Sequence, residues 1–143
     1  MTKWQELATT SHYRTAAAVR EALRRGDVEE AAHGIEALID ALSRSERRAL
    51  EGHIIRLMQH VIKWKFQPER RSRSWQNTIV NARESIADIQ EDTPSLTKEV
   101  IQSTWEQALR KAHREAESEL DMAIPPMSLR WEEVFETQYT ITS

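Results

Sequence analysis

The residues best suited to chemistry are the basic side chains between Arg44 and Arg73. This segment holds nine Lys and Arg and three acidic residues, a net charge of +6; because the whole chain has −3, the remainder carries −9. Such segregation of charge attracts phosphate, acidic protein or nucleic acid, and guanidinium groups bind carboxylates and phosphates through paired hydrogen bonds. We therefore predict an anion- or partner-binding surface formed by Arg56, Lys63, Arg70, Arg71 and Arg73.

The sequence leaves a structural alternative open for the arginines that follow Pro68. They can pair with acids of the negative part of the chain, or they can cap carbonyl groups at the end of the preceding helix. The acids in question are Glu115, Glu117 and Glu119. Side chains one, two and three positions apart cannot all point the same way on a helix, which weakens the interpretation as a single ligand site.

Two histidines raise the question of a metal site. His53 and His60 are seven residues apart, so they project from the same side of one predicted helix. Helical bundles bind metals through carboxylates and a Glu-x-x-His spacing, and neither histidine has that spacing here. We predict no metal and no cofactor, with His53 and His60 as the candidate ligands if a metal binds.

Five tryptophans stand out, and aromatic residues between cations, as in Lys63-Trp64-Lys65-Phe66, can stack on nucleic-acid bases. Trp64, Trp75 and Trp105 lie on apolar helical stripes, however, so core packing accounts for them. The sequence contains no glycine-rich phosphate loop, nucleophile elbow or His-Glu-x-x-His motif. A binding module is therefore favoured over an enzyme.

The composition indicates few, long helices. The chain has 143 residues with only three Gly and four Pro, no Cys, 30% charged and 39% hydrophobic residues. This length suits one domain, and the absence of Cys excludes disulfides and thiolate metal sites. We find no signal peptide and no run of about 20 apolar residues that would span a membrane. The expectation is a cytoplasmic protein without membrane contact.

Periodic apolar residues and helix breakers predict where the helices lie. A first helix ends at Gly26, a second runs from the N-cap Asp27 to Leu42, and a third begins at Ser45 and ends at Phe66. The third has two adjacent apolar stripes and is predicted to be the most buried element. The remaining predicted elements are a fourth helix starting at Pro68, a fifth from Thr93-Pro94-Ser95 to about Leu120, and a short last helix capped by Ser128. We predict a compact single-domain all-α bundle of about five helices plus a short C-terminal helix, covering residues 1–143.

One segment of the sequence is informative beyond its apolar periodicity. It runs from Ser45 to Trp75 and contains the string His60-Val-Ile-Lys-Trp-Lys-Phe-Gln-Pro-Glu-Arg-Arg-Ser-Arg-Ser-Trp75. This string closely resembles the bacterial family called domain of unknown function 29. Glu91 to Leu96 and Ser128 to Phe135 resemble the same family. The resemblance implies a small all-α domain, and it supplies no catalytic mechanism.

The sequence therefore predicts an interaction module whose basic face, from the third helix to the start of the fourth, engages an anionic partner. A protein partner is favoured over nucleic acid, because specific nucleic-acid binding usually requires a more basic domain with a recognisable motif. Two alternatives stay open: a metal-dependent enzyme with a site inside the bundle, and a structural subunit of a larger assembly. The sequence does not specify the partner or the oligomeric state.

Overall fold

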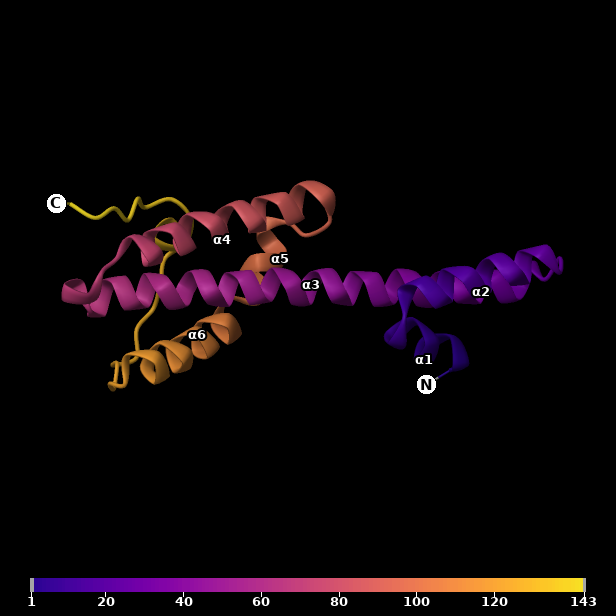
Figure 1. Cartoon of the computed structure of the whole chain (residues 1–143), viewed down its shortest axis with the longest axis horizontal. Helices are drawn as coiled ribbons and strands as arrows, with labels where there is room; N and C mark the ends of the chain where they lie inside the picture. Colours follow the sequence, from indigo (N-terminus) through magenta and orange to yellow (C-terminus); the bar gives the residue numbers. More distant parts are fainter. Residues whose placement is uncertain (1, 143) are drawn as a thin grey trace. The chain divides into compact units, whose positions relative to one another are not determined.

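The fold is all-α, as the sequence predicts. The computed structural model describes residues 2–142, and every regular element in that range is helical (Figure 1). The α-helices are α1 (Lys3–Thr10), α2 (His12–Arg24), α3 (Val28–Phe66), α4 (Arg73–Asp92), α5 (Lys98–Ser103), α6 (Trp105–Leu120) and α7 (Trp131–Phe135), with a 3-10 turn at Pro68–Arg70. No helix in this range is both long and apolar enough to cross a bilayer.

Contacts divide the described chain into two units, which we treat separately. The N-terminal unit covers residues 2–48 and contains α1, α2 and the first part of α3. The C-terminal unit covers residues 49–142 and contains the rest of α3 together with the later helices. The helix α3 thus contributes to the core of each unit.

The predicted break at Ser45 is wrong, because α3 is one continuous helix of 39 residues. Asp27 caps its first turn as expected, and its carboxylate accepts the backbone N–H of Glu30 at 3.2 Å. Ser45 can cap a helix, but the sequence between Gly34 and Gly52 contains neither Gly nor Pro. Nothing there interrupts the backbone hydrogen bonds, and the Glu-Arg-Arg sequence that follows Ser45 favours helix.

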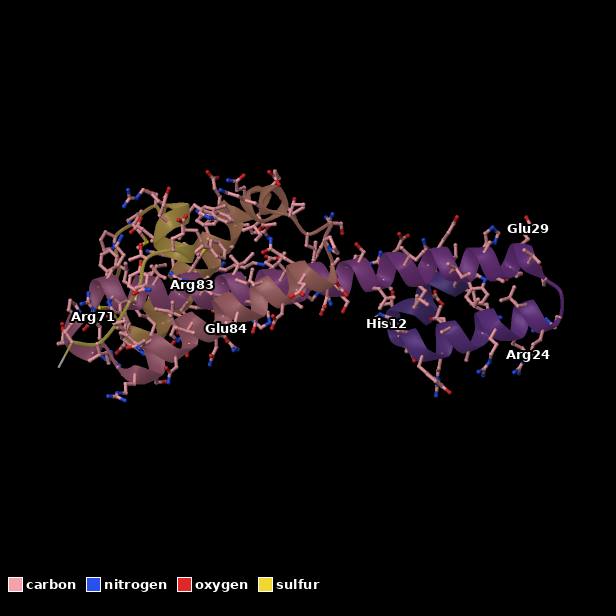
Figure 2. The ribbon with its side chains drawn as sticks, turned by 90° about the horizontal axis from the view of Figure 1, so that it is seen from above. His12, Arg24, Glu29, Arg71, Arg83 and Glu84 are labelled. Atoms are coloured by element: carbon pink, nitrogen blue, oxygen red, sulfur yellow. The ribbon has the colours of Figure 1, made fainter. Side chains whose placement is uncertain are left out.

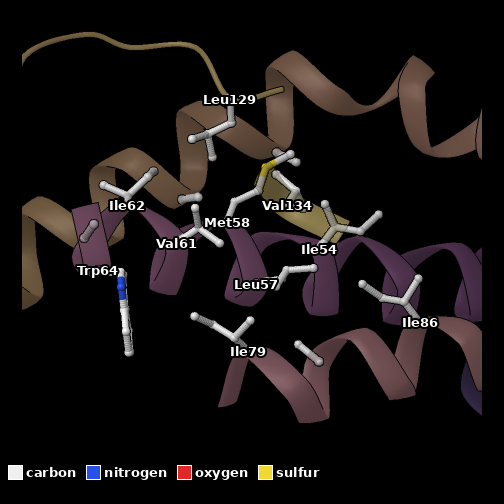
Figure 3. Packing of buried hydrophobic residues seen from close by; sticks show 14 of the residues in the cluster. Ile54, Leu57, Met58, Val61, Ile62, Trp64, Ile79, Ile86, Leu129 and Val134 are labelled. Carbon is white, nitrogen blue, oxygen red and sulfur yellow. The ribbon is translucent and has the colours of Figure 1, made fainter. Parts of the chain in front are cut away.

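The second part of α3 is the buried centre of the C-terminal unit, which confirms the prediction from its double apolar stripe. Ile54, Leu57 and Met58 have no exposed surface. The helices α4 and α6 lie along α3 on different sides (Figure 1). Ile79 and Ile86 of α4 pack against it in the core that Figure 3 shows. The buried face of α6 contains small residues, which allow α6 to approach α3 closely: Ala108, Ala112 and Ala116.

The C-terminal segment closes the remaining side of this core. Leu129 and Val134 are buried in it (Figure 3), and the carbonyl of Leu129 accepts the indole N–H of Trp105 at 3.1 Å. The Nε of Arg83 donates to the Val134 carbonyl at 2.8 Å. Burial lowers the pKa of Arg83 from its ordinary value. These bonds fix a segment that has only five helical residues.

The start of the fourth helix differs from the prediction. Pro68 opens a 3-10 turn that ends at Arg70, and α4 begins at Arg73. The cap is Ser72, whose hydroxyl accepts the backbone N–H of Trp75. Arg70 and Arg71 therefore precede α4 and do not lie in its first turns.

The predicted fifth helix is interrupted and starts later than expected. Thr97 caps α5 by accepting the backbone N–H of Val100, and α6 starts only after Thr104, whose hydroxyl donates to the Ile101 carbonyl at 2.9 Å. Such bonds from hydroxyl to backbone compete with regular helix. The predicted end at Leu120 is right. Arg130 and not Ser128 is the N-cap of α7.

In the N-terminal unit, Gly34 is where the helices α1, α2 and α3 meet. A Cβ atom at Gly34 would lie 2.6 Å from Cγ2 of Val19 and 2.7 Å from the ring of Trp4. The indole N–H of Trp4 donates to the Glu30 carboxylate at 2.9 Å. Only glycine therefore allows α1 and α2 to approach α3 this closely.

We predict that alanine at the two glycines inside α3 will have opposite effects. Gly52→Ala should stabilise the protein by about 0.5–1 kcal/mol through helix propensity, because no atom lies within 4 Å of the new Cβ. Gly34→Ala should destabilise it by about 1–3 kcal/mol, since the methyl group overpacks the contact with Val19 and Trp4. Urea denaturation measures both changes. Stabilisation by Gly34→Ala would contradict the packing of α1 and α2 on α3.

Candidate functional site

Lys63 is a buried cation and not a surface ligand site. Its side chain is only 1% exposed, and its Nζ lies 2.7 Å from a carboxylate oxygen of Glu119. The ammonium also lies 4.6 Å from the ring centroid of Trp75. The hydrogen bond from Lys63 is the largest cause of a lowered pKa for Glu119. This side chain therefore joins α3 to α6 within the fold.

Lys65 of the predicted basic segment and Lys111, which faces that segment, also form ion pairs. Lys65 donates to the carboxylate of Glu133 at 2.5 Å, and that bond is the first cause of the lowered pKa of Glu133. The other carboxylate oxygen of Glu133 caps the backbone N–H of Arg130. Lys111 of α6 lies 3.1 Å from Glu51 of α3. Ion pairs inside the unit thus neutralise part of the charge segregation that the sequence suggests.

The three arginines after Pro68 have different surroundings. The Nε of Arg71 donates to the Trp64 carbonyl at 2.8 Å, and its guanidinium lies 5.0 Å from the Trp64 ring centroid. Arg71 thus follows the structural alternative, since it caps a carbonyl near the end of α3. Arg70 and Arg73 are exposed and form no ion pair with a residue in the described range. Figure 2 shows Arg71 at the end of the C-terminal unit.

The two histidines are not brought together around a metal. Nδ1 of His60 donates to the Arg56 carbonyl at 2.8 Å within α3. Burial is the largest cause of a lowered pKa for His60, so the neutral imidazole is favoured. His53 instead faces α4. Between residues 2 and 142, no three His, Asp or Glu side chains are arranged to hold a metal ion.

A small hollow between α3 and α4 is lined by cationic and neutral polar side chains and by no acidic residue. On the α3 side, His53 and Arg56 are three residues apart and share one face. The α4 side presents polar residues at spacings of three and four, with a small residue beside them: Thr78, Asn81, Ala82 and Ser85. We call this the α3–α4 hollow. Of the cations predicted to bind a partner, it contains Arg56 alone.

The chemistry of the α3–α4 hollow suits an anion. None of its lining residues is acidic, and the side chains of Arg56, Asn81 and Ser85 can donate hydrogen bonds. Thr78 already donates to the Ser74 carbonyl at 2.9 Å. The hollow has a volume of about 100 Å³, well below the roughly 300–1,000 Å³ of sites for whole small molecules. It therefore fits a single anionic group, such as a carboxylate, more readily than a larger ligand.

The sequence contained part of the signal for this hollow. Arg56 was recognisable as a cation on the polar strip of α3. The spacing of Thr78, Asn81 and Ser85 places three polar side chains on one face of α4. The missing information was the register between the two helices, which depends on tertiary packing and not on either helix alone.

Comparisons with known proteins give a family and no activity. The model of the family described as "Domain of unknown function DUF29" matches residues 12–140. No curated protein matches the chain. No solved structure matches it either.

We predict that the two partners of the buried ion pair will respond differently to substitution. Glu119→Ala leaves the Lys63 ammonium buried without its carboxylate and should cost about 2–4 kcal/mol. Lys63→Met replaces the ammonium with an apolar chain of similar size, and Glu119 is half-exposed and stays hydrated. This variant should therefore change stability by less than about 1 kcal/mol.

The pH dependence checks the same pair. Because the pKa of Glu119 is lowered on folding, the ionised carboxylate stabilises the folded state, and this stabilisation is complete above the ordinary carboxylate pKa. The contribution is lost as the pH falls through the lowered value. Urea denaturation at a series of acidic pH values should show a smaller loss for Lys63→Met than for the natural sequence. An equal loss would contradict the pairing.

We predict that Arg71 stabilises the fold and that Arg73 does not. Arg71→Ala removes the hydrogen bond to the Trp64 carbonyl and the contact with its ring, and should cost about 1–2 kcal/mol. Both side chains are exposed, but Arg73 forms no ion pair with a residue in the described range, so Arg73→Ala is the matched control and should change stability by less than about 0.5 kcal/mol. Thermal or urea unfolding measures both. Equal effects would show that the Arg71 contacts are dispensable.

Proposed function

The chain belongs to the DUF29 family, and we propose that it is an interaction module that binds an acidic segment of a partner protein. One observation carries the proposal. The α3–α4 hollow combines the guanidinium of Arg56 with neutral donors, and no acid is among its lining residues. Arg56 forms no ion pair within the described chain, in contrast to Lys63 and Lys65.

The size of the hollow favours a side-chain carboxylate as the anchoring group. Its volume of about 100 Å³ is small beside the roughly 300–1,000 Å³ of sites for whole small molecules. Arg56 can donate two parallel hydrogen bonds to such a carboxylate, and Asn81 and Ser85 add neutral donors beside it. Bonds of this type to a charged group contribute about 1.5–3 kcal/mol each.

The charge distribution supports a protein partner over nucleic acid. The whole chain has a net charge of −3, whereas nucleic-acid binding draws most of its affinity from many cations that contact phosphates. The exposed Arg70 and Arg73 contribute to the proposal through the long-range field, which attracts an acidic segment without requiring direct contacts.

We predict that Arg56→Gln will weaken the binding of a capped, glutamate-rich peptide by about tenfold, because a lost charged hydrogen bond corresponds to roughly that factor. The matched control is Arg73→Gln, which removes the same charge outside the hollow and should change the affinity by less than about threefold. Isothermal titration calorimetry measures the affinities. Backbone amide shifts in the NMR spectrum should concentrate at residues 53–56 and 78–85.

Two results would contradict the proposal. Equal weakening by Arg56→Gln and Arg73→Gln would show general attraction and no anchoring site. Tighter binding of a single-stranded oligonucleotide than of the peptide would assign the surface to nucleic acid instead. Urea denaturation of both variants provides the folding control, and both residues are exposed.

A further inference from the structure

The α2–α3 hairpin of the N-terminal unit exposes a row of large apolar residues that nothing in the described structure covers. We define the apolar face as Tyr13, Leu23, Val28, Ile35, Ile39 and Leu42, each at least 40% exposed. On α3 the members are spaced by seven, four and three residues, which places them in one stripe. Single exposed apolar residues are ordinary, but a continuous stripe marks an interaction surface.

The members of the apolar face on α2 and those on α3 lie on the same side of the hairpin. On α3, the buried row includes Ala31, Gly34 and Ala41. Glu30 and His33 lie beside α1 and flank this buried row on one side. The apolar row flanks the buried row on its other side, because helical residues are about 100° apart.

The same order holds on α2. Ala18 and Glu21 lie beside α1, Val19 and Ala22 are buried, and Tyr13 and Leu23 lie beyond them. Because α1 is a single helix that packs on one side of the hairpin, the apolar row of α3 and the two apolar residues of α2 face the opposite side. The apolar face therefore spans the two helices.

The two edges of the hairpin carry opposite charges. Val19 of α2 lies beside Gly34 of α3, and Ala22 clusters with Ala31. The two helices are antiparallel, so each step forward along α2 matches a step back along α3. Two steps beyond the Ala22–Ala31 contact, Arg24 therefore lies level with Glu29. Figure 2 shows Arg24 and Glu29 at opposite edges of the hairpin. Among the described residues, Arg24 forms an ion pair with the exposed Glu21 at 3.9 Å, so its guanidinium is available to another carboxylate.

We infer that a second copy of this chain packs on the apolar face, related by a twofold axis that runs along the hairpin. This rotation places α2 of one copy over α3 of the other, and it brings each Arg24 beside the Glu29 of the partner copy. A twofold axis across the hairpin would instead set one arginine edge against the other, which is unfavourable.

The area of the face suits a weak, reversible dimer. At 1.5 Å per residue and about 10 Å of width, the stretches 13–23 of α2 and 28–42 of α3 cover roughly 400 Å² per copy, or about 800 Å² in total. That total is below the roughly 1,000 Å² of a stable interface, so we expect a dimer that dissociates readily. The resulting four-helix contact resembles the seam of a helical bundle, with apolar residues inside and opposite charges at the edges.

Sedimentation equilibrium of the full chain tests this inference. We expect a monomer–dimer equilibrium whose dissociation constant rises about tenfold or more in Ile39→Lys, because a charge enters the centre of the apolar contact. Val80→Lys is the matched control. It places the same charge at an exposed apolar residue of α4, outside the face, and should leave the dissociation constant unchanged. Circular dichroism melts confirm that both variants fold.

Charge reversal tests the direction of the axis. Arg24→Glu and Glu29→Arg should each weaken the dimer, and the two changes combined in one chain should restore it. A natural sequence that remains monomeric at its highest soluble concentration would overturn the inference. A dimer that is broken by Val80→Lys and not by Ile39→Lys would also overturn it, as would a double reversal that binds no better than the single ones.

Discussion

The organisation of the C-terminal unit depends on one constraint: between Leu50 and Trp64, α3 is apolar over more than half of its circumference. A helix of this kind must be covered from several directions. The helices α4 and α6 cover it from different sides, and the segment around Leu129 and Val134 completes the enclosure. The short helix α7 owes its position to this requirement, since Arg83 bonds its backbone at Val134 and Trp105 bonds the carbonyl of Leu129 just before it.

A charged group within this buried stretch of α3 makes the packing specific. The ammonium of Lys63 must meet an anion, and Glu119 is the residue of α6 that supplies it. The pair therefore selects one register of α6 along α3, as buried polar groups do in other helical assemblies. The remaining polar strip of α3 includes His53 and Arg56, which lie against α4 and remain free for other interactions. Folding and proposed binding thus use different cations of one basic segment.

The sequence predicted what local patterns determine and missed what depends on contacts between helices. The all-α class, the burial of α3 and the cap at Asp27 follow from apolar periodicity and side-chain chemistry. The break at Ser45 was wrong because a capping residue ends a helix only where the backbone hydrogen bonds also stop. The pairing of Lys63 with Glu119, 56 residues later, and the lining of the α3–α4 hollow require a register that no single helix encodes.

Native-state hydrogen exchange of the full chain tests this central role of α3 most directly. If the enclosed stretch organises the C-terminal unit, the amides from Ile54 to Trp64 exchange only through global unfolding of that unit, and they are the slowest in the protein. Their free energy of opening then equals the free energy of unfolding from denaturant titration. Exchange of these amides as fast as that of the exposed outer positions of α4 would contradict the account.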